Sequence, residues 1–399
     1  MSKRILLIAS TTGYQARVFA EAARRMGLEL VLATDRCHVL EDPWGDDAVP
    51  LRFEEPAPGV AALSARGPFG GIVAVGDRPA YVAAHAAASL GLRFSSPAAV
   101  EATNNKFLAR ERFRAAGMPV PSFRLAPRGT ADETRYPCVL KPLGLSGSRG
   151  VIRADNPAEF VTAFDRITKL VQDPQVLVED FIPGREYALE GLVTEGRLQT
   201  LALFDKPDPL NGPFFEETIY TTPSREPEAV ERSIREMTQR ALSALGLTYG
   251  PVHAEMRVND EGVWMLEVAA RPIGGLCSRV LRFDPDASLE EVLLRHSLGE
   301  DLSSVKLAPG AHGVMMIPIP GAGVYTGVDG LEQARRVPGV EDVMITAKEG
   351  QMMLPLPDGA SYLGFIFARG ETTGRVEAAL QESHKCLGFH LLRALPVVR

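Results

Sequence analysis

The first hundred residues alternate between strand-like apolar runs and segments with helical periodicity. The runs at Lys3–Ala9, Leu28–Ala33 and Gly71–Val75 are typical of strands that are buried on both faces. Apolar residues at helical spacing between the first two runs predict a helix that stops at Gly27. Because strands alternate with helices, residues 1–100 are predicted to form a doubly wound parallel α/β unit.

The pattern changes after this unit. Ser96 and Pro97 are typical of a helix start, and one helix is expected to continue through Lys106 to Gly117. Strands and hairpins are then predicted at 136–141, 175–181, 185–205, 251–258 and 263–269. From about residue 305 the chain is rich in glycine and proline with short strands, which predicts a separate small α+β unit.

Composition and charge argue against several classes of protein. Lys and Arg number 43 against 50 Asp and Glu, and this net charge of −7 is not typical of a nucleic-acid-binding protein. No run approaches the roughly 20 apolar residues that span a bilayer, and Ile5–Ala9 is too short for the apolar core of a signal peptide. The four cysteines are scattered without zinc-site spacing, as expected for reduced thiols. We expect a soluble cytoplasmic protein whose partners are neither nucleic acid nor membrane.

Common catalytic and nucleotide-binding motifs are absent. The turn Ser10–Tyr14 has only one of the three glycines of a dinucleotide-binding loop. The sequences G-x-x-x-x-G-K-[ST], H-E-x-x-H and G-x-S-x-G do not occur. The chain is therefore not predicted to contain a P-loop, a helical zinc-protease site or a serine-hydrolase nucleophile.

A lysine and a glycine-rich loop follow one predicted strand. Lys141 ends an apolar run, and Ser146–Gly150 supplies serines and glycines directly afterwards. Backbone N–H groups of such a loop can wrap phosphate oxygens, and the lysine adds a positive charge. A surface loop beside a solvated lysine would have the same composition, so both interpretations stay open.

Two glutamates flank the next turn. Glu179 and Glu186 lie on either side of Pro183 and Gly184. The backbone of a strand-to-loop hinge can bind an adenine edge, and a carboxylate can accept hydrogen bonds from ribose hydroxyls. The alternative is that both glutamates are ordinary exposed charges beside a turn.

Two further glutamates are predicted to face each other across a hairpin. A hairpin centred on residue 261 places Glu255 opposite Glu267. Like charges in such a pair are destabilising unless one is protonated or a cation lies between them. Mg²⁺ suits this arrangement because it binds one or two carboxylates together with substrate phosphates. The four-residue loop 259–262 centres the turn half a residue earlier, so the pairing needs an odd loop or a bulge. A shifted register would separate the glutamates.

An arginine and a glycine pair follow the second strand of this hairpin. Arg271, Gly274 and Gly275 would suit a carboxylate or a developing oxyanion, since glycines expose backbone N–H groups beside the guanidinium. The alternative is a helix N-terminus with charged flanks. Cys277 is interpreted as a small packing residue.

Taken in order, these segments resemble an ATP-grasp enzyme. The segment after 305, with His312–Pro318 and Leu363–Arg369, resembles the C-terminal domain of L-amino acid ligases. The resemblance implies three parts: an N-terminal α/β domain at 1–100, an ATP-grasp core with a glycine-rich lid at 101–304, and a ligase-type α+β domain at 305–399.

The resemblance also implies roles for individual residues. ATP would be bound by Lys106, Lys141, Ser146, Gly147, Ser148, Arg149, Gly150, Glu179, Asp180, Ile182 and Glu186. Magnesium, or Mn²⁺ in its place, would be bound by Glu255 and Glu267. The substrates would be bound by Glu217, Tyr220, Arg271, Gly274 and Gly275, with Arg271 and Lys141 as the catalytic residues.

Two positions depart from the family pattern. Ala269 stands where many ATP-grasp proteins have an asparagine ligand, so water or a phosphate oxygen would have to fill that place. Tyr220 stands where L-amino acid ligases often have a histidine, although Glu217 would still pair with an α-amino group. Tyr220 changes the shape and polarity of the pocket, which favours a substrate other than a standard amino acid.

The expected function is an ATP-dependent ligase that forms a peptide or amide bond and joins amino acids or amino-acid-like small molecules. It would activate a carboxylate as an acyl phosphate and join it to an amine. The alternatives are a biotin-carboxylase-like or other ATP-grasp activity, and a nucleotide-binding regulatory protein that has lost catalysis, for which Ala269 is the best indication. The resemblance is also compatible with a homodimer.

Overall fold

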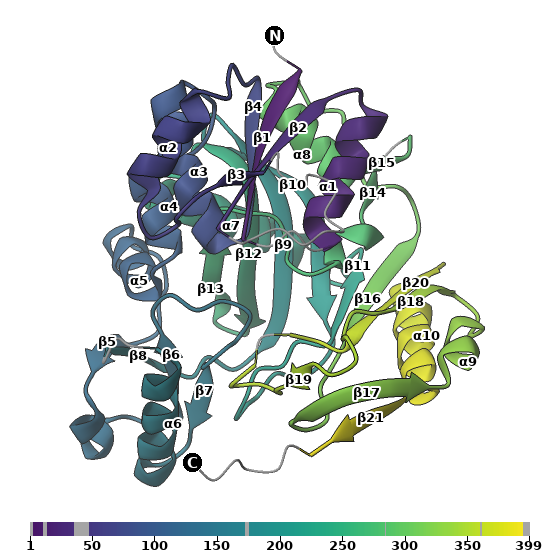
Figure 1. Cartoon of the computed structure of the whole chain (residues 1–399). Helices are drawn as coiled ribbons and strands as arrows, with labels where there is room; N and C mark the ends of the chain where they lie inside the picture. The colour runs from purple at the N-terminus through teal and green to yellow at the C-terminus, as the bar shows by residue number, and fades with distance from the viewer. Residues whose placement is uncertain are drawn as a thin grey trace.

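The computed structural model describes residues 3–10, 14–35, 48–171, 175–283, 285–359 and 361–393. Figure 1 shows an N-terminal α/β unit at the top, a long central sheet, a small sheet with one helix at the lower left, and the C-terminal helices and strands at the lower right. Of the turn Ser10–Tyr14, residues 11–13 lie outside the described ranges, as does Cys37.

The N-terminal unit is a parallel sheet in the order β3-β2-β1-β4. Its strands are β1 (Arg4–Ala9), β2 (Glu29–Thr34), β3 (Val49–Pro50) and β4 (Gly71–Val75), and its helices are α1 (Tyr14–Arg25), α2 (Pro56–Ser64) and α3 (Asp77–Leu90). Ile5 and Leu7 pack with α1, whereas Leu6 and Ile8 pack with α2 and α3. Helices therefore cover both faces, and the predicted doubly wound parallel sheet is confirmed.

The prediction of one continuous helix from Pro97 to Gly117 is wrong, because the helix is interrupted. The structure has two helices, α4 (Pro97–Thr103) and α5 (Lys106–Ala115). The side chain of Asn105 accepts hydrogen bonds from the backbone N–H groups of Phe107 and Leu108, both at 3.1 Å, and so caps a new helix. Lys106 consequently lies at the first position of α5 and not in a helix interior.

A small antiparallel sheet carries the glycine-rich loop. Its order is β5-β8-β6-β7, with strands β5 (Phe123–Ala126), β6 (Cys138–Pro142), β7 (Ile152–Ala154) and β8 (Val176–Asp180). Helix α6 (Pro157–Leu170) packs on it through Phe160, Phe164 and Ile167. We call residues 123–180 the lid subdomain, because the glycine-rich loop connects β6 to β7 at its edge (Figure 1).

The central sheet has eight antiparallel strands in the order β13-β12-β9-β10-β11-β16-β20-β18. The strands are β9 (Arg185–Thr194), β10 (Arg197–Lys206), β11 (Ile219–Thr222), β12 (Tyr249–Asn259), β13 (Gly262–Ala269), β16 (Ala311–Ile317), β18 (Val340–Ile345) and β20 (Gly364–Gly370). Strands from both sides of residue 305 therefore share one sheet. The domain boundaries themselves remain a prediction.

Helices cover the central sheet and join it to its neighbours. They are α7 (Glu228–Leu245), α8 (Leu289–Ser297), α9 (Leu331–Arg335) and α10 (Thr373–Lys385). Short strands complete the fold: β14 (Arg282–Phe283), β15 (Ala287–Ser288), β17 (Gly323–Asp329), β19 (Met352–Met353) and β21 (Gly388–Leu392). Within the described residues, no helix combines the length and the apolar character needed to cross a bilayer.

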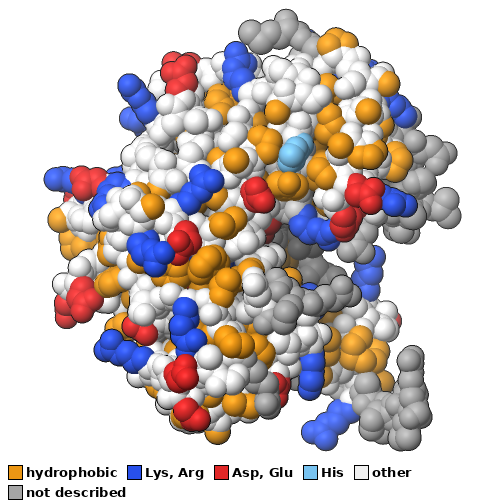
Figure 2. Space-filling view, turned by 90° about the vertical axis from the view of Figure 1, so that its left-hand side faces the viewer, with side chains coloured by type: hydrophobic (Ala, Val, Ile, Leu, Met, Phe, Trp, Pro, Cys, Tyr) orange, Lys and Arg blue, Asp and Glu red, His pale blue; other side chains and the backbone are white. Residues whose placement is uncertain are grey.

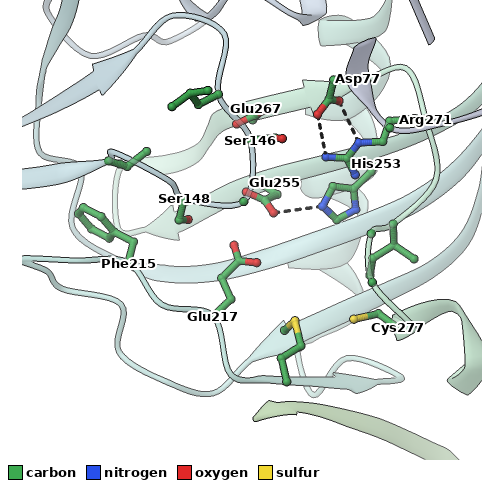
Figure 3. Close-up of a pocket in the computed structure, with 18 of the residues that line it drawn as sticks. Asp77, Ser146, Ser148, Phe215, Glu217, His253, Glu255, Glu267, Arg271 and Cys277 are labelled. Carbon is green, nitrogen blue, oxygen red and sulfur yellow. Dashed lines mark hydrogen bonds and ion pairs between the residues drawn. The ribbon is translucent and has the colours of Figure 1, made fainter. Parts of the chain in front are cut away.

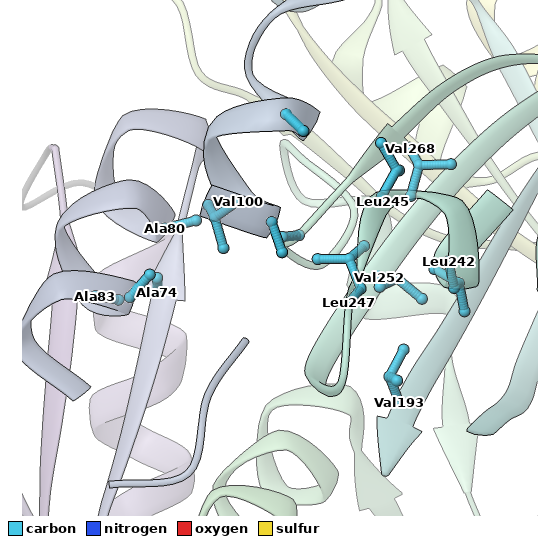
Figure 4. Close-up of a cluster of buried hydrophobic side chains, with 14 of the residues drawn as sticks. Ala74, Ala80, Ala83, Val100, Val193, Leu242, Leu245, Leu247, Val252 and Val268 are labelled. Atoms are coloured by element: carbon cyan, nitrogen blue, oxygen red, sulfur yellow. The ribbon is translucent and has the colours of Figure 1, made fainter. Parts of the chain in front are cut away.

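One hydrophobic cluster fixes the N-terminal unit to the central sheet. Ala80 and Val100 from α3 and α4 belong to the same buried cluster as Leu245 and Val252 from α7 and β12 (Figure 4). At roughly 25 cal/mol per Å² of buried apolar surface, such a contact strongly favours one arrangement of the two units.

On the face drawn in Figure 2, Lys and Arg side chains are interspersed with Asp and Glu.

Candidate active site

The hairpin β12–β13 brings two glutamates into one cross-strand pair. Glu255 lies opposite Glu267, whereas the next pair towards the turn is Met256 with Met265. Leu266 is therefore the extra residue of a β-bulge, which reconciles the pairing with the short turn. The predicted pairing is confirmed, and of the two ways to reach it, an odd loop or a bulge, the structure has the bulge.

The two glutamates lie in a cavity of about 690 Å³ between the N-terminal unit, the lid subdomain and the central sheet. It also receives Thr346, Gln351 and Tyr362 from the C-terminal part of the chain. The predicted site residues that line it are Lys106, Lys141, Ser146, Gly147, Ser148, Glu179, Asp180, Ile182, Glu186, Glu217, Tyr220, Glu255, Glu267, Arg271, Gly274 and Gly275. One cavity thus brings together segments that are far apart in the sequence.

Two predicted ATP-binding residues are not among those that line the cavity. The Arg149 Nε donates a hydrogen bond to the carbonyl oxygen of Asp358 at 3.0 Å. The backbone N–H of Gly150 donates to the carbonyl oxygen of Pro357, also at 3.0 Å. These contacts attach the end of the glycine-rich loop to the C-terminal part, and ATP binding by Arg149 and Gly150 remains a prediction.

Lys141 belongs to a buried ion cluster at the lid side of the cavity. Its Nζ lies 2.6 Å from Glu179 Oε2, and Arg110 Nε and Nη2 donate to the same carboxylate at 2.5 and 3.2 Å. Burial alone would raise the carboxyl pKa of Glu179, but Arg110 and Lys141 lower it to about 2. Burial lowers the pKa of Lys141. The positive charge of Arg110 lowers it further, and the two together outweigh the opposite effect of Glu179. The Glu179 side chain holds Lys141, so only its backbone is left for the predicted adenine hinge.

Lys206, at the end of β10, lies within a second cluster at the sheet side of the cavity. Its Nζ is 3.0 Å from Glu186 Oε1, 2.7 Å from Glu217 Oε1 and 3.2 Å from Glu255 Oε1. Burial would lower the pKa of Lys206, but the three carboxylates raise it well above its ordinary value. Burial and the neighbouring Glu255 raise the carboxyl pKa of Glu217 to about 7.

The three glutamates around Lys206 also have the spacing of a metal site. Oxygen atoms of Glu186, Glu217 and Glu255 lie within 4.8 Å of one another. The ammonium of Lys206 contacts all three carboxylates, however, so a cation of the protein's own already compensates this cluster. We therefore do not interpret it as a metal cage.

Glu186 and Tyr220, predicted to contact ribose and substrate, make further contacts around this cluster. Arg257 Nε donates to Glu186 Oε2 at 2.9 Å, so both oxygens of Glu186 are in ion pairs. The Tyr220 hydroxyl donates to Glu217 Oε2 at 2.5 Å. Glu217 is thus held by a hydroxyl and an ammonium. The ribose and substrate roles remain predictions.

Arg271 is positioned by the N-terminal unit. Its Nε and Nη2 donate to the two carboxylate oxygens of Asp77 at 2.9 and 3.4 Å (Figure 3). Asp77 begins α3, directly after β4. Burial would raise the carboxyl pKa of Asp77, but Arg271 lowers it. The predicted catalytic arginine therefore enters the cavity already paired, with its orientation fixed by a bidentate contact.

Comparisons with known proteins place the fold among known families. The family described as ATP-grasp domain matches residues 134–280, and the family described as L-amino acid ligase C-terminal domain 2 matches residues 315–391. A crystal structure of L-amino acid ligase from Bacillus licheniformis superposes with a TM-score of 0.84 and 25% identity over 98% of this chain and 99% of that chain. The chain contains an ATP-grasp domain followed by an L-amino acid ligase C-terminal domain 2.

Curated relatives match part of the ATP-grasp protein. Dapdiamide A synthase of Enterobacter agglomerans is 27% identical over 55% of this chain and 53% of its own length. Alanine–anticapsin ligase of Bacillus subtilis is 26% identical over 48% of this chain and 46% of its own length. The alignments thus span about half the length of these relatives. A biotin carboxylase from Campylobacter jejuni, with 16% identity and a TM-score of 0.69 over 98% of this chain and 93% of that chain, shares the fold.

The paired glutamates of this ATP-grasp protein fit a magnesium ion. Both face the cavity in Figure 3, and their donor atoms are oxygens, as Mg²⁺ prefers. Lys106 Nζ lies 3.3 Å from Glu267 Oε2 and donates to the carbonyl oxygen of Leu145 at 2.6 Å, next to the glycine-rich loop. Ala269 is buried and offers no ligand atom, so phosphate oxygens or water would complete the coordination.

Several residues of this ATP-grasp site escaped the sequence prediction. Lys206 ends an apolar strand in the same way as Lys141, so the same signal could have found it. Arg110 and Asp77 gave no local signal, because their partners lie 69 and 194 residues away along the chain. Cys277 lines the cavity, and burial and Glu217 raise the pKa of its thiol, consistent with a packing role.

Proposed function

We propose that this protein is an ATP-dependent, ADP-forming ligase that joins a carboxylate to an amine through an acyl phosphate. The observation that carries the proposal is the pair Glu255–Glu267, aligned by the bulge and lying in one cavity with Lys106, Lys141 and Arg271. Paired carboxylates beside lysines suit a nucleotide with its Mg²⁺, because phosphoryl transfer depends mainly on positioning and charge neutralisation.

Each group would have a distinct role in the reaction. Lys106 and Lys141 would bind phosphate oxygens, and the backbone of Ser146–Gly147 would cover them. Mg²⁺, held by Glu255 and Glu267, would supply charge neutralisation on the phosphoryl oxygens. Arg271 would hold the substrate carboxylate, and later its acyl phosphate, in contact with its guanidinium. No protein nucleophile is required, because the amine itself attacks the activated carbonyl and phosphate leaves.

The amine substrate would bind near Glu217. This carboxylate lines the cavity, is held by Tyr220 and Lys206, and has a pKa of about 7. A carboxylate in this position can accept hydrogen bonds from an α-ammonium group. The support from relatives is that Bacillus and Enterobacter proteins similar to this chain are named as ligases or synthases.

A release assay for ADP and phosphate tests the proposal. Pairs of amino acids and related acids and amines are incubated with ATP and Mg²⁺, and products are identified by mass. We expect ADP and phosphate in equal amounts only when a suitable acid and amine are both present. The product should have the summed mass of the acid and the amine minus one water. Tight ATP binding without turnover across the panel would instead favour the regulatory alternative.

A further inference from the structure

A histidine beside the first of the paired glutamates connects two parts of the site. His253, on β12, lies two residues before Glu255 and opposite Glu190 on β9. Its Nε2 is 3.1 Å from Glu255 Oε1, and its Nδ1 forms a hydrogen bond with Glu190 Oε1. His253 is 7% exposed and Glu190 is 1% exposed, so water competes little for either contact.

Glu190 extends these contacts to the loop that carries Arg271. Its second oxygen, Oε2, accepts a hydrogen bond from the backbone N–H of Ile273 at 3.1 Å. Ile273 lies two residues after Arg271 and directly before the glycine pair at Gly274. A continuous chain of hydrogen bonds therefore runs from this loop through Glu190 and His253 to Glu255.

The chemistry of the partners determines which groups donate and which accept in this series of hydrogen bonds. Ionised carboxylates only accept hydrogen bonds, so both ring nitrogens of His253 donate when the two glutamates are ionised. The contact from His253 falls on Glu255 Oε1, the same oxygen that Lys206 contacts at 3.2 Å. Fixing one oxygen of a carboxylate restricts the rotation of its side chain, and this leaves Oε2 oriented for another ligand.

We propose that His253 and Glu190 are positioning residues, which hold Glu255 for a divalent cation and couple its orientation to the Arg271–Gly274 loop. This inference rests on the proposed function, because it presumes a cation at Glu255 and Glu267. Neither residue touches the reacting atoms in this account. Their effect is transmitted through Glu255 and through the backbone of Ile273.

Two substitutions of His253 separate its contacts. In asparagine the amide nitrogen is separated from Cα by as many bonds as Nδ1 is in histidine. In glutamine it is separated from Cα by as many bonds as Nε2 is in histidine. His253→Asn therefore keeps a donor for Glu190 and loses the one for Glu255, whereas His253→Gln keeps the donor for Glu255. His312→Gln is the matched control, because His312 is 3% exposed on β16 of the same sheet and does not line the cavity.

The measurement is Mn²⁺ binding by electron paramagnetic resonance in the presence of a non-hydrolysable ATP analogue. It needs no amino-acid substrate and no turnover. We expect His253→Asn to weaken Mn²⁺ binding by about 10- to 100-fold, the usual effect of removing a residue that orients a metal ligand. His253→Gln keeps the donor for Glu255 but loses the one for Glu190, so we expect it to weaken Mn²⁺ binding less than His253→Asn does. His312→Gln is expected to bind Mn²⁺ like the unsubstituted protein.

Glu190→Gln is a second, milder test. The glutamine side chain offers one acceptor oxygen for two donors, Ile273 N–H and His253 Nδ1–H. One of the two contacts can therefore persist, so we expect a smaller loss of Mn²⁺ affinity than in His253→Asn. Melting temperatures identify any variant that does not fold. If His253→Asn and Glu190→Gln both fold and bind Mn²⁺ like the unsubstituted protein, the positioning role is wrong while the proposed function stands. If the unsubstituted protein binds no Mn²⁺ with the analogue, both are wrong.

Discussion

Lys141 and Lys206 are buried lysines of the same cavity, but the charges around them are balanced differently. Lys141 shares the single carboxylate of Glu179 with Arg110, so cations are in excess there. Lys206 contacts three carboxylates. The difference appears in the glutamates as well, since the carboxyl pKa is about 2 for Glu179 and about 7 for Glu217.

This contrast divides the cavity into a cationic end at the lid subdomain and an acidic end at the central sheet. A polyphosphate is attracted to the first, and a metal ion or an ammonium group to the second. Glu267 and Lys106, 3.3 Å apart, join the two ends. A ligase that brings ATP, Mg²⁺ and an amine together needs both kinds of environment within one cavity.

The largest expected effect comes from removing the cation of the acidic end. Lys206→Met leaves Glu186, Glu217 and Glu255 without their shared ammonium, and we expect the free energy of unfolding to fall by about 3–5 kcal/mol. Denaturant titration measures this. The matched control is Lys141→Met, where Arg110 still pairs with Glu179, and the expected loss is about 1 kcal/mol. Equal losses in the two variants would contradict the contrast.

The two ends should also respond oppositely to pH. The raised pKa of Glu217 means that, between pH 4.5 and about 7, the folded protein keeps a proton that the unfolded chain releases, so stability falls as pH rises through this window. The lowered pKa of Glu179 gives stability that is present above pH 4.5 and is lost as pH falls towards about 2.

Urea titrations at a series of pH values measure both slopes. Each group changes the free energy of unfolding by up to about 1.4 kcal/mol per pH unit within its window. Glu217→Gln is expected to remove this carboxyl's own contribution between pH 4.5 and 7, measured as the difference from the unsubstituted protein. The difference is needed because burial lowers the pKa of His296 to about 4, which gives an opposite slope over part of that window. An unchanged profile in Glu217→Gln would show that this carboxyl does not titrate near neutrality.

Lys141→Met should affect nucleotide binding more than folding. We expect the KM for ATP to rise by about 10- to 100-fold, which corresponds to one hydrogen bond to a charged group. Steady-state kinetics with a substrate pair found in the release assay measures this. If KM for ATP is unchanged, Lys141 serves only to compensate Glu179.

The smallest effect is expected for an ion pair outside the cavity. Arg166 in the lid subdomain contacts Asp358 through both oxygens at 2.9 and 2.6 Å, but the two side chains are 40% and 39% exposed. Solvent screens such pairs, so Arg166→Gln should cost less than about 1 kcal/mol in unfolding free energy. A loss as large as that of Lys206→Met would mean that burial does not explain the contrast.

The sequence predicted those parts of the site that depend on local patterns. Alternation of apolar and polar residues located the hairpin, and the symmetry of Glu255 and Glu267 about residue 261 predicted their pairing. The end of an apolar strand likewise located Lys141 and the glycine-rich loop that follows it. Such signals work because strand periodicity and turn chemistry involve neighbours in the chain.

Ion pairs between distant segments could not be predicted in this way. Asp77 reaches Arg271 only because one hydrophobic cluster joins α3 to the central sheet. The single helix predicted to continue through Lys106 places Asn105 in its interior, whereas Asn105 is an N-cap. A polar residue within a helical pattern does not by itself show which of the two it is. The continuation of the central sheet beyond residue 305 depends on strand pairing that apolar patterns do not specify.

The proposed ligase activity depends most directly on a cation between Glu255 and Glu267. A crystal structure with Mn²⁺ and a non-hydrolysable ATP analogue tests this through anomalous difference density. We predict a peak bridging these two carboxylates and the phosphate oxygens, with Lys206 still in contact with Glu186 and Glu217. A peak among Glu186, Glu217 and Glu255 with Lys206 displaced, or nucleotide without any peak beside Glu267, would contradict the account.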